Sequence, residues 1–484
     1  MKFNKIFIIL LAISVLTTSC VDFDELNTDP ERLDKVNPGS LLNPVLYNIA
    51  TTNWNRYLGF TFQLMQGRVS LVNTNTQTWY IIGDGDGNAH WNNSYRMLNN
   101  IMLMERMAED LNEPNYIAIG MVLRSYLFHL ITDAFGNAPM TEAGRAREEI
   151  FQPQFDDQKA IYRQIISDLR DANEMFITAA SGAGAGLRYN GEGDFLYGAG
   201  TASSASAAAI LNWKRFCNSL RLRVLMRVVD VQEFNSLLEI KAILADPASN
   251  PIFTSNANAA LMLITGIAPM EGPTTNLNNM SNNQCASEFF VETFRKWNDP
   301  RLPLYASLVD GEYIGMPEGY VTIPPGNKSQ PNRQYAQWPL KICLMSYAEV
   351  EFIIAELAQR GLIEAGAEAA YKKGVEAAIL QWERGISFPV NYFDNEHTAY
   401  DGTLYRIHEQ KFHALYFCDY QQWFEHTRTG MPDIPRGPGV SPSNRMPQRF
   451  IYPSILQRTN LKNYQDARTA MGGDDLYVKL FWQK

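Results

Sequence analysis

Residues Tyr116–Phe135 read YIAIGMVLRSYLFHLITDAF, and this stretch decides the fold class. Apolar side chains recur along it at helical spacing and form one stripe: Ile119, Leu123, Leu127, Leu130 and Ala134. Other large apolar residues, such as Met121 and Phe128, fall elsewhere around the same axis. The pattern therefore predicts a helix that packs against neighbours on two sides.

A second stretch, Ser346–Gly361, repeats this arrangement as SYAEVEFIIAELAQRG. Val350, Ile354 and Leu357 share one face, while Phe352 extends another. Helices that are covered on two sides are what a stacked array of helix pairs requires. The sequence thus predicts a mainly α protein built as a scaffold of helical pairs.

The pattern along the chain divides it into four parts. We expect helices at roughly 41–65, 91–111, 115–135, 155–176, 213–230, 233–245, 346–388 and 404–430. A Gly-, Ala- and Ser-rich loop at 178–209 interrupts the first group, and periodicity fails from 246 to 340. The predicted parts are a signal segment (1–19), an N-terminal helical scaffold (20–245), a loop-rich lobe (246–345) and a C-terminal helical scaffold with a tail (346–484).

The N-terminus, MKFNKIFIILLAISVLTTSC, has the features of an export signal. Lys2 and Lys5 precede an apolar run that is too short to span a bilayer, and small residues follow. The ending Leu16–Cys20 resembles the lipobox of bacterial lipoproteins, which implies acylation of Cys20. The acidic stretch Val21–Glu25 is similar to signals that send such lipoproteins to the cell surface.

Charge and cysteine content exclude some classes of function. The formal net charge is −9, and no run of Lys and Arg suited to phosphate binding occurs, so nucleic acid is not an expected partner. Apart from Cys20, the cysteines are far apart in sequence and lie in apolar surroundings: Cys217, Cys285, Cys343 and Cys418. We expect them to be small buried side chains.

Motifs for catalysis are also missing from the sequence. HEQKFH at 408–413 resembles a zinc-protease motif, but His408 and His413 are five residues apart, about 140° around a helix. The zinc motif needs a spacing of four. We also find no G-x-S-x-G elbow, P-loop or Cys-His metal cluster. The sequence predicts neither an enzyme nor a cofactor.

Seven segments along the chain form a recognisable set. They are LNTDP (26–30), DAFGNAP (133–139), WKRFCNSLRLRVLMR (213–227), WNDPRLP (297–303), SYAEVEFIIAELAQRG (346–361), EQKFHALYFCDYQQWFEHTRTGMP (409–432) and PQRFIYPSILQRTNLKNYQDA (447–467). Together they resemble the SusD/RagB family of surface nutrient-binding lipoproteins. They occur in the family's order over nearly the whole chain. Each segment is weak singly, and the set is specific.

This resemblance implies a fold, a location and a partner. The fold would be four tetratricopeptide-like helical pairs with a variable loop-rich lobe. The protein would be lipid-anchored in the outer membrane, facing the cell exterior, and would deliver oligosaccharide to a SusC-like TonB-dependent transporter. Peptide capture, as in RagB, is the main alternative, and a surface hydrolase is a further one.

Aromatic residues in loops are the candidate ligand contacts, because sugar rings lie against aromatic faces. The segment 73–93 gathers Trp79, Tyr80, Asn88 and His90, and in SusD-like proteins this connection can reach the ligand-facing side. Trp338, after a Pro-rich loop, is a second candidate platform. For each aromatic ring, packing against its own surroundings stays an open alternative.

The centre of the first segment, DGDGN at 84–88, begins like a calcium loop. Asp84, Asp86 and Asn88 occupy the first three ligand positions, but Ala89 stands where the loop needs glycine and Tyr95 where it needs glutamate. We therefore expect a polar turn, with Asp84 and Asp86 as metal candidates only for an irregular site.

Overall fold

The computed structural model describes residues 36–72, 76–273 and 278–483. Within it, Pro38–Lys484 forms one compact unit. The predicted signal segment, the acylation site Cys20 and the LNTDP motif lie outside the described residues. The boundaries expected for the loop-rich lobe stay predictions.

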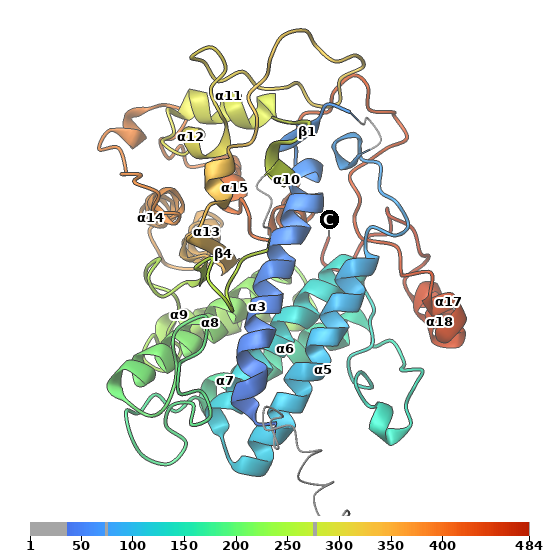
Figure 1. Cartoon of the computed structure of the whole chain (residues 1–484), viewed down its shortest axis with the longest axis vertical. Helices are drawn as coiled ribbons and strands as arrows, with labels where there is room; N and C mark the ends of the chain where they lie inside the picture. Colours follow the sequence, from blue (N-terminus) through green and yellow to red (C-terminus); the bar gives the residue numbers. More distant parts are fainter. Residues whose placement is uncertain (1–35, 73–75, 274–277, 484) are drawn as a thin grey trace, which may run out of the picture. The chain divides into compact units, whose positions relative to one another are not determined.

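The first half of the unit is a series of helices packed in chain order. They are α3 (Pro38–Arg56), continued by a π-helical turn (Tyr57–Thr61) and α4 (Phe62–Leu64), then α5 (Asn88–Leu111), α6 (Pro114–Phe135), α7 (Gln158–Met175), α8 (Ser204–Arg227) and α9 (Ser236–Ala245). Helix α5 packs against α3, and each of α6 to α9 packs against the helix that precedes it in the chain (Figure 1). Only a short turn joins α5 to α6, so these two helices form a hairpin.

The second half supplies a further set of helices. They are α10 (Asn278–Ser281), α11 (Glu288–Trp297), α12 (Leu302–Tyr305), α13 (Tyr347–Gln359), α14 (Ala367–Leu380), α15 (Leu404–Ala414), α16 (Gln421–Thr429), α17 (Leu456–Thr459) and α18 (Leu461–Ala470). Helix α13 packs against both α14 and α15, and α15 packs against α16. The predicted mainly α, tetratricopeptide-like scaffold is confirmed.

Local sequence explains where several helices begin. The Asp157 carboxylate accepts hydrogen bonds from the backbone N–H groups of Lys159 and Ala160 and so caps α7. Ser346 does the same for α13 through the N–H of Glu349. Pro114 occupies the first turn of α6, where its missing N–H costs no hydrogen bond. These caps fix the starts of helices whose length the apolar pattern sets.

Helix α6 is the centre of the core, as its sequence predicts. Side chains from both of its faces are buried, including Leu123, Leu127 and Phe128, each at most 1% exposed. Among the described residues, α6 is also the one helix long and apolar enough to cross a membrane. Because 83% of its apolar window is buried within the protein, it is a core helix here.

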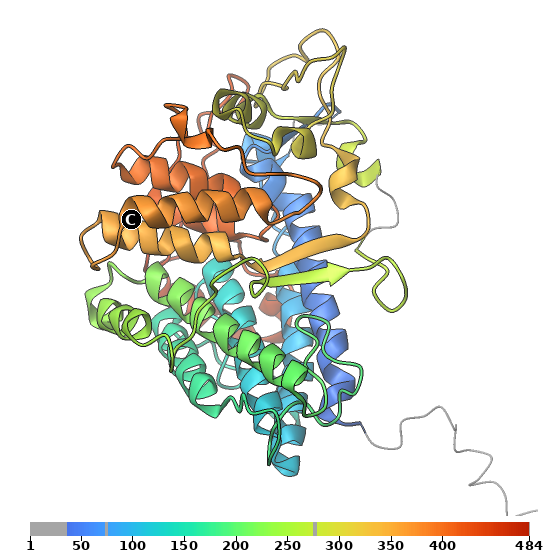
Figure 2. The same ribbon diagram turned by 90° about the vertical axis from the view of Figure 1, so that its left-hand side faces the viewer.

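Two short antiparallel ladders join segments distant in sequence. Strand β1 (Arg68–Ser70) pairs with β3 (Gln284–Ala286), and β2 (Ala260–Ile264) pairs with β4 (Leu340–Met345). Figure 2 shows β2 and β4 as adjacent arrows beside α3, which β4 contacts. The second ladder ends at the pair Ile264 and Leu340, so the residues just beyond each strand are brought together.

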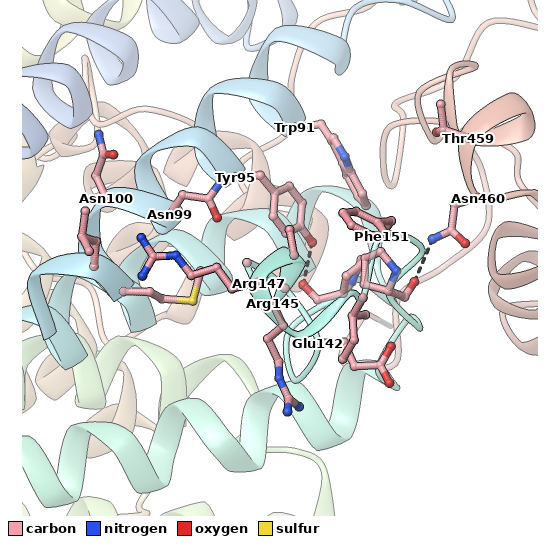
Figure 3. Close-up of a pocket in the computed structure, with 18 of the residues that line it drawn as sticks. Trp91, Tyr95, Asn99, Asn100, Glu142, Arg145, Arg147, Phe151, Thr459 and Asn460 are labelled. Atoms are coloured by element: carbon pink, nitrogen blue, oxygen red, sulfur yellow. Dashed lines mark hydrogen bonds between the residues drawn. The ribbon is translucent and has the colours of Figure 1, made fainter. Parts of the chain in front are cut away.

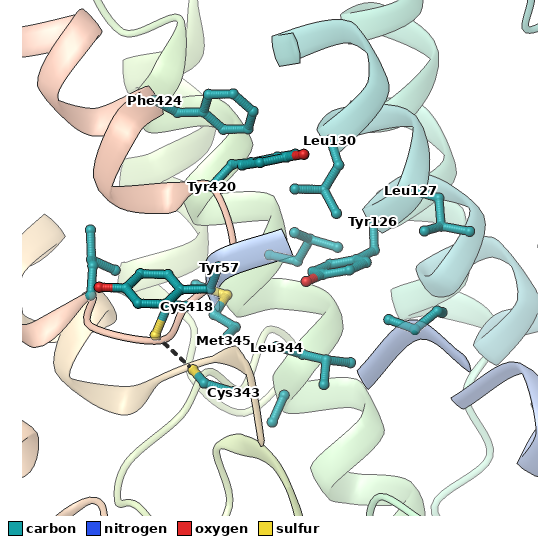
Figure 4. Close-up of a cluster of buried hydrophobic side chains, with 14 of the residues drawn as sticks. Tyr57, Tyr126, Leu127, Leu130, Cys343, Leu344, Met345, Cys418, Tyr420 and Phe424 are labelled. Carbon is teal, nitrogen blue, oxygen red and sulfur yellow. Dashed lines mark hydrogen bonds between the residues drawn. The ribbon is translucent and has the colours of Figure 1, made fainter. Parts of the chain in front are cut away.

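The core also contains buried polar groups. The predicted burial of the four cysteines is confirmed, and the Cys418 thiol lies 3.0 Å from the Cys343 sulfur (Figure 4). Figure 4 places this thiol pair in an aromatic and aliphatic cluster with Tyr57 and Tyr420. Buried ion pairs add directional contacts between the two halves, as between Arg56 of α3 and Asp419.

Candidate functional site

Trp338 stands apart from the other tryptophans. All nine tryptophans fall within the described residues, and eight of them are at most 6% exposed. Trp338 is 43% exposed. A large aromatic ring that is kept at the surface, in a protein that buries all its other tryptophans, is a candidate contact for a ligand.

Two glycines form the support beneath this ring. A Cβ atom at Gly266 would lie 2.6 Å from the Trp338 ring, and one at Gly272 would lie 2.5 Å from its Nε1 atom. Both glycines have positive φ angles, +82° and +97°, which other residues adopt only with strain. The ring therefore rests directly on backbone that follows β2, and a side chain at either position would displace it.

The segment that carries Trp338 is held on its other side by Arg384. The guanidinium of Arg384 donates hydrogen bonds to the carbonyl oxygens of Gln337 and, at 2.9 Å, Pro339. Next to this segment lies a hollow of about 110 Å³. Its lining consists of Leu263, Tyr335, Pro339, Leu340, Lys341, Trp382, Glu383 and Arg384. The ring is thus fixed in place beside a small recess with a mixed polar and apolar lining.

The structure corrects the expectation of an exposed platform at Trp79 and Tyr80. Trp79 is 3% exposed and meets Tyr320 edge-on, with 5.0 Å between ring centroids. Tyr80 is 6% exposed, and its burial raises the pKa of its hydroxyl. Tyr320 covers this pair from one loop segment. Asn444 covers it from another, and its side-chain amide donates a hydrogen bond to the Trp79 carbonyl. Neither ring offers an open face to a sugar.

The DGDGN segment is a turn that leads into a helix. The Asp86 carboxylate accepts a hydrogen bond from the N–H of Gly83 at 3.0 Å, and α5 begins at Asn88. A twelve-residue calcium loop starting at Asp84 would need residues 88–91 in the loop, whereas here they form the first turn of α5. The predicted polar turn is therefore what the structure contains, with Asp84 and Asp86 exposed to solvent.

His90, a predicted ligand contact, lies in the interior. It is 1% exposed, and its Nε2–H donates to the Leu130 carbonyl at 3.1 Å. Nδ1 is then the acceptor for the Arg56 guanidinium, 2.8 Å away. Burial, followed by the positive charge of Arg56, holds the pKa of His90 well below its usual value. The imidazole is neutral and positions Arg56.

A separate cavity nevertheless opens above this pair. Its volume is about 280 Å³, and its lining is Thr52, Asn55, Arg56, Gly59, Phe60, Gln77, Asp86, Ala89, His90, Asn93 and Tyr420. Asn88 does not line it, although the buried Oδ1 of Asn88 has no hydrogen-bond partner among the described residues. The cavity is a second place where amide groups could meet hydroxyl groups.

One cluster has the side-chain types of a metal site, but its carboxylates are already paired with cationic side chains. Glu356, His408 and Glu425 have ligand atoms within 4.8 Å of one another. Arg428 forms ion pairs with both carboxylates, and Lys411 binds Glu425 at 2.9 Å. Burial lowers the pKa of His408 to about 4. Because cationic side chains already neutralise the carboxylates, this cluster is a buried ion-pair network.

Gly266 and Gly272 are the site residues that the sequence did not indicate. They belong to the stretch TGIAPMEG at 265–272, which reads as an ordinary surface loop. Nothing in the sequence connects it with Trp338, more than sixty residues away, before the β2–β4 pairing is known.

The fold is shared with several solved structures. A chitin-binding protein superposes with a TM-score of 0.78 at 23% identity, over 93% of this chain and 100% of the other. A SusD homologue from Bacteroides fragilis gives 0.71 at 22% identity, over 93% and 100%. A SusD homologue from Bacteroides uniformis gives 0.74 at 19% identity, over 92% and 99%. No curated protein matches the chain by sequence.

A family model decides the assignment. The model named SusD-like and described as starch-binding, associating with the outer membrane, matches residues 30–453. This range includes helices α3 to α16, both ladders and Trp338. The chain therefore belongs to the SusD-like family, which consists of outer-membrane-associated, nutrient-binding proteins.

Proposed function

We propose that this protein captures an oligosaccharide at the cell surface and delivers it to a SusC-like TonB-dependent transporter. The observation that carries the proposal is the exposure of Trp338 on its glycine support. The family description, starch-binding with an outer-membrane association, supports the ligand class. A similar structure named as a chitin-binding protein supports it further.

The proposed contact is a sugar ring lying against the Trp338 indole. An indole combines a large apolar surface with an N–H group, so it suits a ligand with apolar C–H faces and hydroxyl edges. Exposed polar side chains near the ring, Gln337 and Glu383, would accept or donate hydrogen bonds to hydroxyl groups. Leu263 and Ile267, 45% and 74% exposed, extend the apolar surface around it.

In this proposal the ligand undergoes no reaction. Capture and delivery need only reversible binding, and an affinity of roughly micromolar to millimolar is sufficient where an anchor keeps the local concentration high. Acylation of Cys20 would provide that anchor at the outer membrane. Substitution of Cys20 by Ala should release the protein from membranes, and labelled fatty acid should no longer be incorporated.

The test of the ligand site is calorimetry on a panel of neutral glycans with Trp338→Ala. We expect about a tenfold loss of affinity, since a well-placed aromatic contact contributes roughly 1 kcal/mol or more. Tyr405, on α15 and 41% exposed, gives a matched control for removal of a surface aromatic ring. Tyr405→Ala should bind like the wild type.

Other outcomes would redirect the proposal. Unchanged affinity in Trp338→Ala, together with a loss in Asn93→Ala, would move the ligand site to the cavity above His90. Binding of peptides but not of any glycan would favour the RagB-like alternative. Release of cleaved products from either ligand would contradict a pure binding function.

The proposed transporter partner needs its own test. Tagged protein isolated from outer membranes with mild detergent should bring down a TonB-dependent barrel in a stoichiometric amount. Isolation of the protein alone, under conditions that keep other outer-membrane complexes intact, would contradict delivery through such a partner.

A further inference from the structure

The face of α5 that points away from the core contains a separate groove. Its volume is about 590 Å³, and its walls are α5, the segment 139–153 and α17 with the residues after it (Figure 3). In Figure 1, α17 lies on one side of α3 and α5, whereas β4, which Trp338 precedes, lies on the other. The groove is therefore distinct from the Trp338 surface, and a role for it is independent of the function proposed for that surface.

One stripe of α5 forms the floor of the groove. Trp91, Tyr95, Asn99, Met102 and Arg106 all line it, at intervals of three or four residues. With a rise of 1.5 Å per residue, the stripe is about 22 Å long. It changes along its length from aromatic rings through an amide to a cationic end, which suits an extended ligand better than a compact one.

The opposite wall is fixed to the floor and to α17. The Tyr95 hydroxyl donates to the Pro139 carbonyl at 2.8 Å, and the Asn460 amide donates to the Pro153 carbonyl at 2.7 Å. A Cβ atom at Gly144 would lie 2.3 Å from the Met102 Cε, so the wall approaches α5 closely there. Phe151 projects from this wall with 73% of its surface exposed.

The charges that line the groove are mostly positive and partly unused. Arg106 and Arg147 form neither a hydrogen bond nor an ion pair with any residue that the structure describes. Arg145 pairs with Glu148, whose pKa is lowered by this hydrogen bond and also by the charge of Arg106. The one carboxylate in the lining, Glu142, accepts a hydrogen bond from the backbone N–H of Gln154.

We infer that this groove binds an anionic oligosaccharide whose carboxylate groups meet Arg106 and Arg147. Guanidinium groups bind carboxylates through paired, charge-assisted hydrogen bonds. The exposed amides of Asn99 and Asn100 suit hydroxyl groups, and Phe151 offers a ring face. An acidic peptide fits less well, because no described strand lines the groove to pair with a peptide backbone.

The positive lining also contrasts with the rest of the molecule. The whole chain has a formal net charge of −9, so an anionic ligand would be repelled at long range unless a local positive region attracted it. Arg106 on the α5 floor and Arg147 on the opposite wall provide such a positive region. Binding should accordingly weaken as ionic strength rises.

The test uses calorimetry with a short oligogalacturonate, its methyl ester, a neutral malto-oligosaccharide and an oligoglutamate of similar length. The oligogalacturonate should bind and the methyl ester should bind at least about tenfold more weakly, because charge-assisted hydrogen bonds are lost. Arg106→Gln and Arg147→Gln should each reduce the affinity to a similar degree. Lys241→Gln on α9 removes one exposed positive charge elsewhere and should have no effect.

Each contrary result is decisive. Equal binding of acid and methyl ester, unchanged affinity in both arginine variants, or no binding of the oligogalacturonate would overturn the inference. Tighter binding of oligoglutamate would assign the groove to an acidic peptide. Trp338→Ala tests whether the groove and the Trp338 surface act independently. It should leave oligogalacturonate binding intact while weakening neutral-glycan binding.

Discussion

Arg223 of α8 and Glu349 of α13 form a buried ion pair that joins the two halves of the scaffold. Two nitrogens of the guanidinium bind the two carboxylate oxygens, at 2.7 and 2.6 Å. The side chains are 2% and 4% exposed. The two residues are 126 positions apart, so this contact connects two helices that are distant from each other in the sequence.

Glu349→Ala should destabilise the protein by roughly 3–5 kcal/mol, because it leaves the Arg223 charge buried without a partner. Chemical denaturation would measure the loss. The double substitution Arg223→Met with Glu349→Leu should recover much of it, since both charges are then removed. Arg170→Ala, which breaks an exposed pair with Glu239, should cost less than about 1 kcal/mol.

Trp338 should dominate the quenching of tryptophan fluorescence by iodide, because the other eight indoles are buried. In Trp338→Phe the quenchable fraction should almost disappear, and saturating glycan should protect it in the wild type. Substantial quenching that survives the substitution would show that a second indole is accessible.

Gly266→Ala should weaken glycan binding without unfolding the scaffold. The added Cβ would come within 2.6 Å of the Trp338 ring and also strain a backbone with a φ of +82°, so the ring must shift. Circular dichroism should stay helical while calorimetry shows reduced affinity. Gly402→Ala is the control, since its φ of +76° gives similar backbone strain but no atom lies within 4 Å of the added Cβ.

His413 should make the fold sensitive to acid. Burial lowers the pKa of His413 to about 3, whereas the unfolded chain titrates near 6.5. Between these values the unfolded state binds a proton that the folded state does not, so stability falls as pH falls. The expected contribution is about 1.4 kcal/mol per pH unit.

The measurement for His413 compares the slopes of unfolding free energy against pH, from about pH 6 to 4. His413→Asn should remove its share of the slope, whatever its effect on absolute stability. His397, whose side chain is 49% exposed, provides the control substitution His397→Gln. Equal slopes in wild type and His413→Asn would contradict a neutral buried imidazole.

The four described cysteines should resist thiol reagents in the folded protein. Burial raises the pKa of Cys217 to about 12 and that of Cys285 to about 11, so little thiolate forms near neutral pH. A form lacking residues 1–20 should show almost no reaction with a disulfide reagent until denaturant is added, and should then titrate four thiols. Rapid reaction of a native thiol would indicate an opening near it.

The sequence predicts the helices well where burial on two sides leaves a dense apolar pattern. The helix expected at 115–135 is α6, Pro114–Phe135, almost residue for residue. The helix expected at 404–430 is instead broken into α15 and α16. Phe417 and Asp419, which lie between α15 and α16, have positive φ angles that end the helix. A backbone break of this kind leaves the apolar periodicity of the sequence largely unchanged.

The ladders and the ligand surface were harder to predict because they depend on distant partners. Strands β1 and β3 have three residues each, too few to show an alternating pattern. Trp79 and Trp338 look equally available in the sequence. Only Tyr320, which covers the first, and Gly266, which supports the second, distinguish them, and both lie far away along the chain.

The apolar character of α6 has a consequence for secretion. The predicted export signal would require this helix to pass fully through the inner membrane, although it is apolar enough to remain there. Arg124 and Asp133, which form ion pairs in the folded protein, each oppose insertion by up to about 3 kcal/mol near a bilayer centre. The same two charges that form ion pairs in the core would therefore also oppose lateral insertion of α6 into the bilayer and favour its passage across the membrane.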